Sequence, residues 1–213
     1  MSFKKDSCGL LKEYIKRDFS AYLLVSVVVL IGLIFGATYA ATMGIDGIEI
    51  SYFLEAGFKS LKSGDIPNQI TIAQNSFKNN FITAFFIWFS GITVILSPLI
   101  LIALFVKGMS IGFTVSFLVK DLGISGGATA VVSVLPHNVL LIPMFIVLGA
   151  VSTGFCINFI KSNILKSKSI KSSKPAFIRA VLIMTVSVFI IAIASFIQAF
   201  ISPALLILAS RFI

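Results

Sequence analysis

Apolar residues fill long stretches of this chain, and polar residues interrupt them at intervals that suit membrane-spanning helices. A hydrocarbon core about 30 Å thick is crossed by about 20 helical residues. The apolar stretches run over residues 21–39, 81–106, 108–120, 128–160 and 177–200. We expect the second to bend near Gly91 or Pro98 and the tail to bend at Ser202-Pro203. The pattern predicts an all-α polytopic membrane bundle of about five transmembrane helices, with residues 1–213 forming one domain.

The fourth stretch is too long for one straight crossing. Residues 128–160 would extend for about 50 Å as a single α-helix. Pro136 and Pro143 lie within it, and each removes a backbone donor and crowds the preceding turn. We therefore predict a short apolar piece, a proline-broken segment near His137, and then the fourth span. A turn is expected before this stretch, at Gly123, Gly126 and Gly127.

Composition and charge support a membrane location and give the chain an orientation. Apolar residues make up 58% of the chain, charged residues 12%, and the mean hydropathy is +1.07. With the N-terminus inside, twelve Lys and Arg residues, Lys107 among them, lie at the cytoplasmic face and five lie outside, which follows the positive-inside rule. The C-terminus is then extracytoplasmic. The net charge of +9 is explained by topology and attraction to anionic lipid, not by nucleic-acid binding.

Two basic segments are assigned to the cytoplasm. Residues 1–19 alternate apolar and basic positions at helical spacing, which predicts an amphipathic helix in the membrane interface; a charged tail that only fixes topology is the alternative. Residues 161–176 are rich in Lys and Ser and are interpreted as a solvated basic loop with affinity for anionic lipid.

The segment from residue 44 to residue 80 is predicted to be an extracytoplasmic loop with two short amphipathic helices. Its first apolar stripe is interpreted as either a cap on the bundle or a partner-binding surface, and it consists of Tyr52, Phe53, Phe58 and Leu61. The second stripe follows the turn at residues 63–67 and consists of Ile70, Ala73, Phe77 and Phe81.

The candidate chemistry is sparse, and we expect no enzyme, cofactor or metal site. Cys8 and Cys156 fit no metal spacing, and no phosphate-binding glycine loop occurs. Gly123-Ile124-Ser125-Gly126 resembles the Gly-x-Ser-Gly of rhomboid intramembrane proteases, with His137 as the available base. Only eleven residues separate Ser125 from His137, whereas in rhomboids the histidine lies two spans later. An intramembrane serine protease is therefore the least favoured alternative.

His137, the only histidine, has two interpretations. A polar side chain at membrane depth is costly unless it is paired, which makes it a functional candidate by default. The structural alternative is that its ring bonds a carbonyl freed by Pro136, with Asn138 in a similar role. We favour the structural role, because no acid accompanies His137 in the membrane. The predicted kink comprises Pro136, His137, Asn138 and Pro143.

Small residues along the spans allow close helix approach. Gly108-Met109-Ser110-Ile111-Gly112 mimics a hydrolase nucleophile elbow, but small residues four apart in an apolar helix are better explained by helix packing. The same contacts could form within one chain or between two copies, which leaves homo-oligomerisation open. The predicted packing positions are Gly108, Gly112, Gly149 and Gly154.

The order of these features resembles the stage II sporulation protein M family over most of the chain. The resemblance consists of the basic N-terminal segment, Asn79-Asn80, Gly91, the segment Lys107 to Gly112, and Leu135-Pro136-His137. The broader group typically continues Pro-His with glycine and a nearby glutamate, whereas this chain has Asn138 and Leu141. That departure argues against an intramembrane His-Glu pair.

The resemblance implies a scaffold in endospore formation. Similar proteins anchor two cell-wall-degrading partners, sporulation proteins of the D and P type, at the septal membrane while the mother cell engulfs the forespore. The expected localisation is therefore the cell membrane, as a multi-pass protein of the mother cell. A small transporter or channel that uses the broken helix around His137 is the alternative function.

Overall fold

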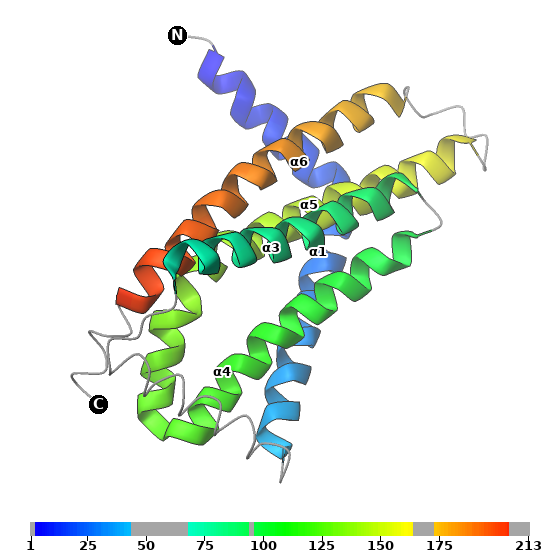
Figure 1. Cartoon of the computed structure of the whole chain (residues 1–213). Coiled ribbons are helices and arrows are strands. Elements are labelled where there is room, and N and C mark those ends of the chain that lie inside the picture. The colour runs from blue at the N-terminus through cyan, green and yellow to red at the C-terminus, as the bar shows by residue number, and fades with distance from the viewer. Residues whose placement is uncertain (1–2, 44–67, 94–95, 164–172, 205–213) are drawn as a thin grey trace.

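A computed structural model of the protein describes residues 3–43, 68–93, 96–163 and 173–204. The described part is a helical bundle, which confirms the predicted fold class (Figure 1). Its elements are α1 (Phe3–Thr42), α3 (Gln69–Ile92), α4 (Ser97–Ser133), α5 (Leu135–Asn163), α6 (Ser173–Phe196) and the π-helical turn η1 (Ile197–Ile201).

Four stretches of the described helices are long and apolar enough to cross a membrane. They are Phe19–Thr42, Ser97–Ser133, Leu135–Ile157 and Phe177–Ala204. Helix α3 has 24 residues but a polar N-terminal half, and it packs against α4, α5 and α6 as the fifth member of the bundle. Figure 1 places the α3–α4 and α5–α6 ends together at one end of the bundle, with the Gly123 turn and the end of α1 at the other.

Helix α1 is one element of 40 residues. The predicted N-terminal helix is present from Phe3 onward and continues without a break into the first span. Its place in the membrane interface stays a prediction. From Phe19 onward, one face of the helix packs inward through Val25 and Val29. The opposite face exposes large apolar side chains such as Leu30 and Ile34, as a lipid-facing helix does.

The predicted second span, Phe81 to Val106, is wrong as a single helix, because α3 ends at Ile92 and α4 begins at Ser97. The backbone N–H of Thr93 bonds to the Phe89 carbonyl and closes α3, and Pro98 lies in the first turn of α4, where its missing donor costs nothing. The expected boundary at Gly108 is absent. Lys107 consequently lies inside a helix and not at the cytoplasmic face where we placed it.

The inward face of α3 differs from the predicted apolar stripe. Ile70 is 61% exposed, and Phe77 is only partly buried. The buried face carries three polar residues, Ser76, Asn80 and Ser90, together with Ala84, Ile87 and Gly91. When lipid is the solvent, polar side chains find partners only inside the bundle, so the polar stripe turns inward.

The structure changes the bounds of the two predicted loops. Helix α3 begins at Gln69, where a helix was predicted after the turn at residues 63–67, and it continues to Ile92 without a boundary at residue 80. Helix α5 continues to Asn163 and α6 begins at Ser173, which shortens the basic loop of residues 161–176. The predicted partner-binding residues lie outside the described residues, and they are Tyr52, Phe53, Phe58 and Leu61.

Helix α4 is a helical hairpin, which confirms the turn that the glycines predicted. Gly123 has φ 61° and ψ −137°, a conformation that only glycine adopts without strain. The short arm after it folds back so that Ala130 and Val134 pack against Leu118. The chain then breaks at Val134, and α5 starts at Leu135. This is the predicted short apolar piece and break, with the break lying just before Pro136; Pro143 lies inside α5.

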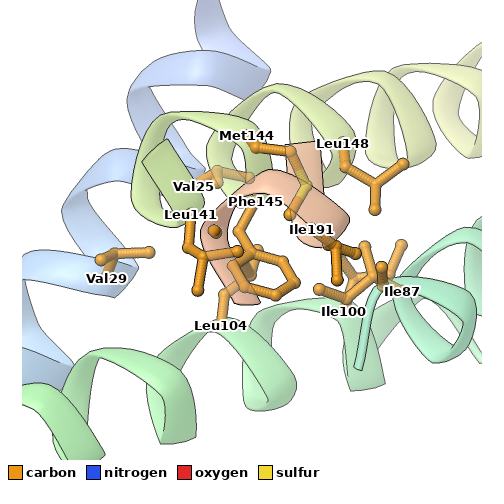
Figure 2. Packing of buried hydrophobic residues seen from close by; sticks show 12 residues of the cluster. Val25, Val29, Ile87, Ile100, Leu104, Leu141, Met144, Phe145, Leu148 and Ile191 are labelled. Atoms are coloured by element: carbon orange, nitrogen blue, oxygen red, sulfur yellow. The ribbon is translucent and has the colours of Figure 1, made fainter. Parts of the chain in front are cut away.

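Side chains from five helices meet in one apolar core (Figure 2). Phe145 of α5 is 2% exposed and lies among Leu104 of α4, Leu141 and Ile191. Val25 and Val29 of α1 close one side, and Ile87 of α3 closes another. After α6, η1 occupies residues 197–201, and residues 202–204, where a bend of the tail was predicted, are helical.

Candidate functional site

A polar pocket of about 700 Å³ lies between α3, both arms of α4, the start of α5 and η1. Most buried surface in a membrane bundle is apolar, so a cavity with this many polar side chains marks a candidate site. The pocket is lined by Ile72, Asn75, Ser76, Asn79, Asn80, Lys107, Ser110, Ile111, Thr114, Ser133, Val134, His137, Asn138, Leu141 and Gln198.

Lys107 is the only formally charged residue among those that line the pocket. Its Nζ donates a 2.7 Å hydrogen bond to Oδ1 of Asn80, and it lies 5.3 Å from the centroid of the Phe145 ring. A carbonyl oxygen and an aromatic face both stabilise an ammonium ion. None of the described residues that line the pocket is Asp or Glu.

Asn80 connects Lys107 to the C-terminal end of α6. Its Nδ2 donates 2.9 Å to the Ser76 carbonyl, and the hydroxyl of Ser76 donates to Oε1 of Gln198. Gln198 lies in η1, where the wider π-helical turn changes the direction of successive side chains. π-helical turns occur often at functional sites because they redirect one side chain without ending the helix.

The helix break forms the opposite wall of the pocket. Asn138 is buried, and its Nδ2 donates 2.8 Å to the carbonyl of Val134, the residue at the break. The same amide nitrogen lies 3.1 Å from Nε2 of His137. Since an amide N–H donates, Nε2 accepts, which leaves the ring proton on Nδ1.

Asn138 has the structural role predicted for it, because its side chain bonds the Val134 carbonyl at the break. The Nδ1 atom of His137 lies buried beside the Ser133 backbone and makes no well-formed hydrogen bond with any described residue. His137 thus brings a donor to the pocket, while Asn138 secures the start of α5.

Gly108 and Gly112 lie where α4 crosses α1 of the same chain. A Cβ on Gly108 would meet the Val29 carbonyl, and one on Gly112 would meet the Leu33 carbonyl. On the other side, Gly32 and Gly36 are equally close to Phe105 and Met109. The two glycine pairs allow backbone-to-backbone contact, the geometry of paired small residues in membrane helices.

The remaining predicted packing glycines lie on α5. A Cβ on Gly149 would lie 2.7 Å from Leu104 Cδ1, so this position lets α5 approach α4. Gly154 is buried. Gly91 of α3 faces Ser152 of α5, where a Cβ would lie 2.6 Å from the serine Cβ.

Of the two residues considered for hydrolysis, His137 lines the pocket, and Ser125, in the first turn after Gly123, does not. Within residues 3–43, 68–93, 96–163 and 173–204, no three His, Cys, Asp or Glu side chains form a group that could hold a metal ion.

Sequence reasoning missed the centre of this site. Asn80 was interpreted as the start of a span and Lys107 as the end of one, whereas the structure joins them in the interior. Nothing in the sequence pattern marked Gln198 as a site residue. The available signal was a lysine in an apolar tract without an acid nearby, which already marks a functional candidate.

Comparison with known proteins gives one match. The family model described as "Stage II sporulation protein M" matches residues 25–203, a range that includes all four membrane-spanning stretches except the first turns of Phe19–Thr42 and the last residue of Phe177–Ala204. No curated protein and no solved structure matches the chain.

Proposed function

We propose that this chain, which belongs to the stage II sporulation protein M family, is a membrane scaffold for engulfment during endospore formation. Its partners in this proposal are peptidoglycan-degrading sporulation proteins of the D and P type, which it recruits to the septal membrane. The observation that carries the proposal is the family match over residues 25–203, because that match covers nearly the whole membrane body.

The arrangement of the helices supports a scaffold that reaches the wall side. The basic N-terminal segment favours a cytoplasmic start for α1, so residues 44–67 would emerge on the opposite face. The turn between the two arms of α4 lies at the same end of the bundle as the C-terminal end of α1 (Figure 1). Hydrolases that act on peptidoglycan work on that side, and residues 44–67 include the apolar positions Tyr52, Phe53, Phe58 and Leu61.

The direct test is crosslinking from the 44–67 segment in sporulating cells. A photoreactive amino acid at Tyr52 or Phe58 should capture a wall hydrolase of the D or P type, identified by mass spectrometry. The same photoreactive residue at Lys168, in the basic connection between α5 and α6, is the matched control and should not capture it. Capture of hydrolases from Lys168 but not from Tyr52 or Phe58 would contradict the proposal.

A transporter or channel is the second candidate, and the polar pocket beside the break before Pro136 is the observation that favours it. Broken helices in transporters present backbone groups to a substrate near the middle of the membrane. Flux through proteoliposomes that is abolished by His137→Ala would support this function. Absence of flux, together with intact hydrolase crosslinking, would exclude it in favour of the scaffold.

A further inference from the structure

Lys107 places a positive charge inside the bundle without a matching negative charge in its pocket. It lies ten residues after the start of α4, and Asn80 lies twelve residues before the end of α3. At 1.5 Å per residue both are about 15 to 18 Å from the α3–α4 connection, which is about half of a 30 Å hydrocarbon core. A charge at that depth is costly and is usually paired.

The contacts of Lys107 fit the ammonium ion better than the neutral amine. Asn80 offers a carbonyl oxygen at 2.7 Å, so the lysine acts as donor. The Phe145 ring lies beneath the same nitrogen at 5.3 Å, in cation–π geometry. An ammonium has three donors, and Asn80 is the one hydrogen-bond acceptor found for it in the described residues.

Other groups in the pocket also attract negative charge. The first turn of α5 lines it through His137 and Asn138, and the N-terminal end of a helix carries partial positive charge. Nδ1 of His137 is a buried donor with no well-formed bond to a described residue. Exposed amide side chains of Asn75 and Asn79 add further donors on the α3 side.

We propose that this pocket binds an anionic oxygen group, a phosphate or a carboxylate, which pairs with Lys107 inside the bundle. The pocket of about 700 Å³ is large enough for a phospholipid headgroup or a small soluble anion. The bound anion supplies the charge that the lining lacks. Anion binding at this pocket does not depend on whether the protein recruits wall hydrolases, because the pocket is formed by residues of the membrane body alone.

The test uses the full chain in nanodiscs of phosphatidylcholine, a lipid without net charge. Three probes are titrated separately: a short-chain phosphatidylglycerol, inorganic phosphate and acetate. The readout is the midpoint of thermal unfolding, followed by the fluorescence of Trp88, the single tryptophan. The variants are Lys107→Gln, which removes the charge, and Lys78→Gln as the matched control, because Lys78 is exposed on α3 and does not line the pocket.

A saturable rise in the midpoint with at least one probe is expected for the wild type and for Lys78→Gln. Lys107→Gln should weaken that response by about tenfold or more, as the loss of a charge-assisted contact predicts. A response to phosphatidylglycerol alone identifies a lipid headgroup, and a response to phosphate or acetate identifies a soluble anion. No saturable response to any probe, or an equal response in Lys107→Gln, overturns the proposal.

A second variant tests the charge argument while leaving Lys107 in place. Asn80→Asp puts a carboxylate where the amide oxygen now accepts the lysine bond, and so supplies the missing anion internally. This variant loses the Nδ2 bond to the Ser76 carbonyl but gains an ion pair with Lys107, so it should fold without added anion and should lose the saturable response. A response to the probes as strong as that of the wild type would overturn the proposal even if Lys107→Gln fails to fold.

Discussion

Lys107 of α4 and Asn80 of α3 are joined by a 2.7 Å hydrogen bond from Nζ to Oδ1. Asn80 also holds the backbone of Ser76, whose hydroxyl bonds Gln198 in η1. One buried amide therefore ties three elements around the polar pocket. This explains why α3, whose N-terminal half is polar, turns Ser76 and Asn80 into the bundle.

Replacing Asn80 with Leu should destabilise the bundle. The substitution removes the acceptor of a charged donor, and a hydrogen bond to a charged group contributes about 1.5 to 3 kcal/mol. We expect the free energy of unfolding in detergent to fall by about that amount. Asn79→Leu is the control, because the Asn79 side chain, next to Asn80 in the sequence, is exposed. It should change the free energy of unfolding by less than about 0.5 kcal/mol. Equal effects of the two substitutions would contradict the role given to Asn80.

Gly112→Ala should separate α1 from α4. The new Cβ would meet the backbone carbonyl of Leu33, which cannot move away as a flexible side chain could. Forced separation of packed helices costs about 1 to 3 kcal/mol. Gly127→Ala is the matched control on the short arm of α4, since the nearest atom to its Cβ is Val119 Cγ2 at 3.8 Å. The measurement is the thermal midpoint of each variant, and a loss in Gly127→Ala as large as in Gly112→Ala would count against the contact.

Lys120→Met should loosen the C-terminal end of α1. Lys120 Nζ donates to the carbonyl of Ala41, in the last turn of α1, and to that of Met43, just after the helix. The last carbonyls of a helix have no partner within it. A cation at a helix C-terminus contributes about 0.3 to 1 kcal/mol. Hydrogen exchange of the last turn of α1, residues 39–42, should accelerate in Lys120→Met and stay near wild type in Lys120→Arg. Unchanged exchange in Lys120→Met would show that the contact does not hold the helix end.

Trp88→Phe should weaken the contact between α3 and α6. Trp88 Nε1 donates 3.1 Å to the carbonyl of Ala180, and phenylalanine keeps an aromatic ring but is smaller than the indole and lacks this donor. The expected loss is about 1 kcal/mol, the net value of one neutral hydrogen bond. Because this variant removes the single tryptophan of the chain, its unfolding is measured by circular dichroism and not by fluorescence. Stability equal to the wild type would indicate that water or lipid replaces the bond.

Hydrophobic runs and glycines predicted much of this fold. The fold class, the turn at Gly123 and the broken start of α5 follow from local rules, because apolar length, positive φ and proline chemistry each act within a few residues. Gly108 and Gly112 could be recognised as packing positions from their spacing. Their partners Gly32 and Gly36 have the same spacing, but only the structure pairs them.

The helix boundaries and the residues at the centre of the pocket could not be predicted from local sequence rules. A Lys or Asn in an apolar tract has two explanations, the end of a span or a buried pair, and the choice depends on a partner far along the chain. Lys107 and Asn80 are 27 residues apart, and Ser76 and Gln198 are 122 apart. Periodicity also chose the wrong face of α3, because the rule that apolar faces turn inward fails where the outer solvent is lipid.

The most direct test of the account is the accessibility of position 55 in intact cells. Glu55→Cys in a background of Cys8→Ser and Cys156→Ser is treated with a maleimide that cannot cross the membrane, and Lys168→Cys in the same background is the control. If residues 44–67 face the wall, position 55 is labelled in intact cells and position 168 only after permeabilisation. Labelling of position 168 in intact cells, with position 55 protected until the membrane is opened, would contradict it, because wall hydrolases could not then reach residues 44–67.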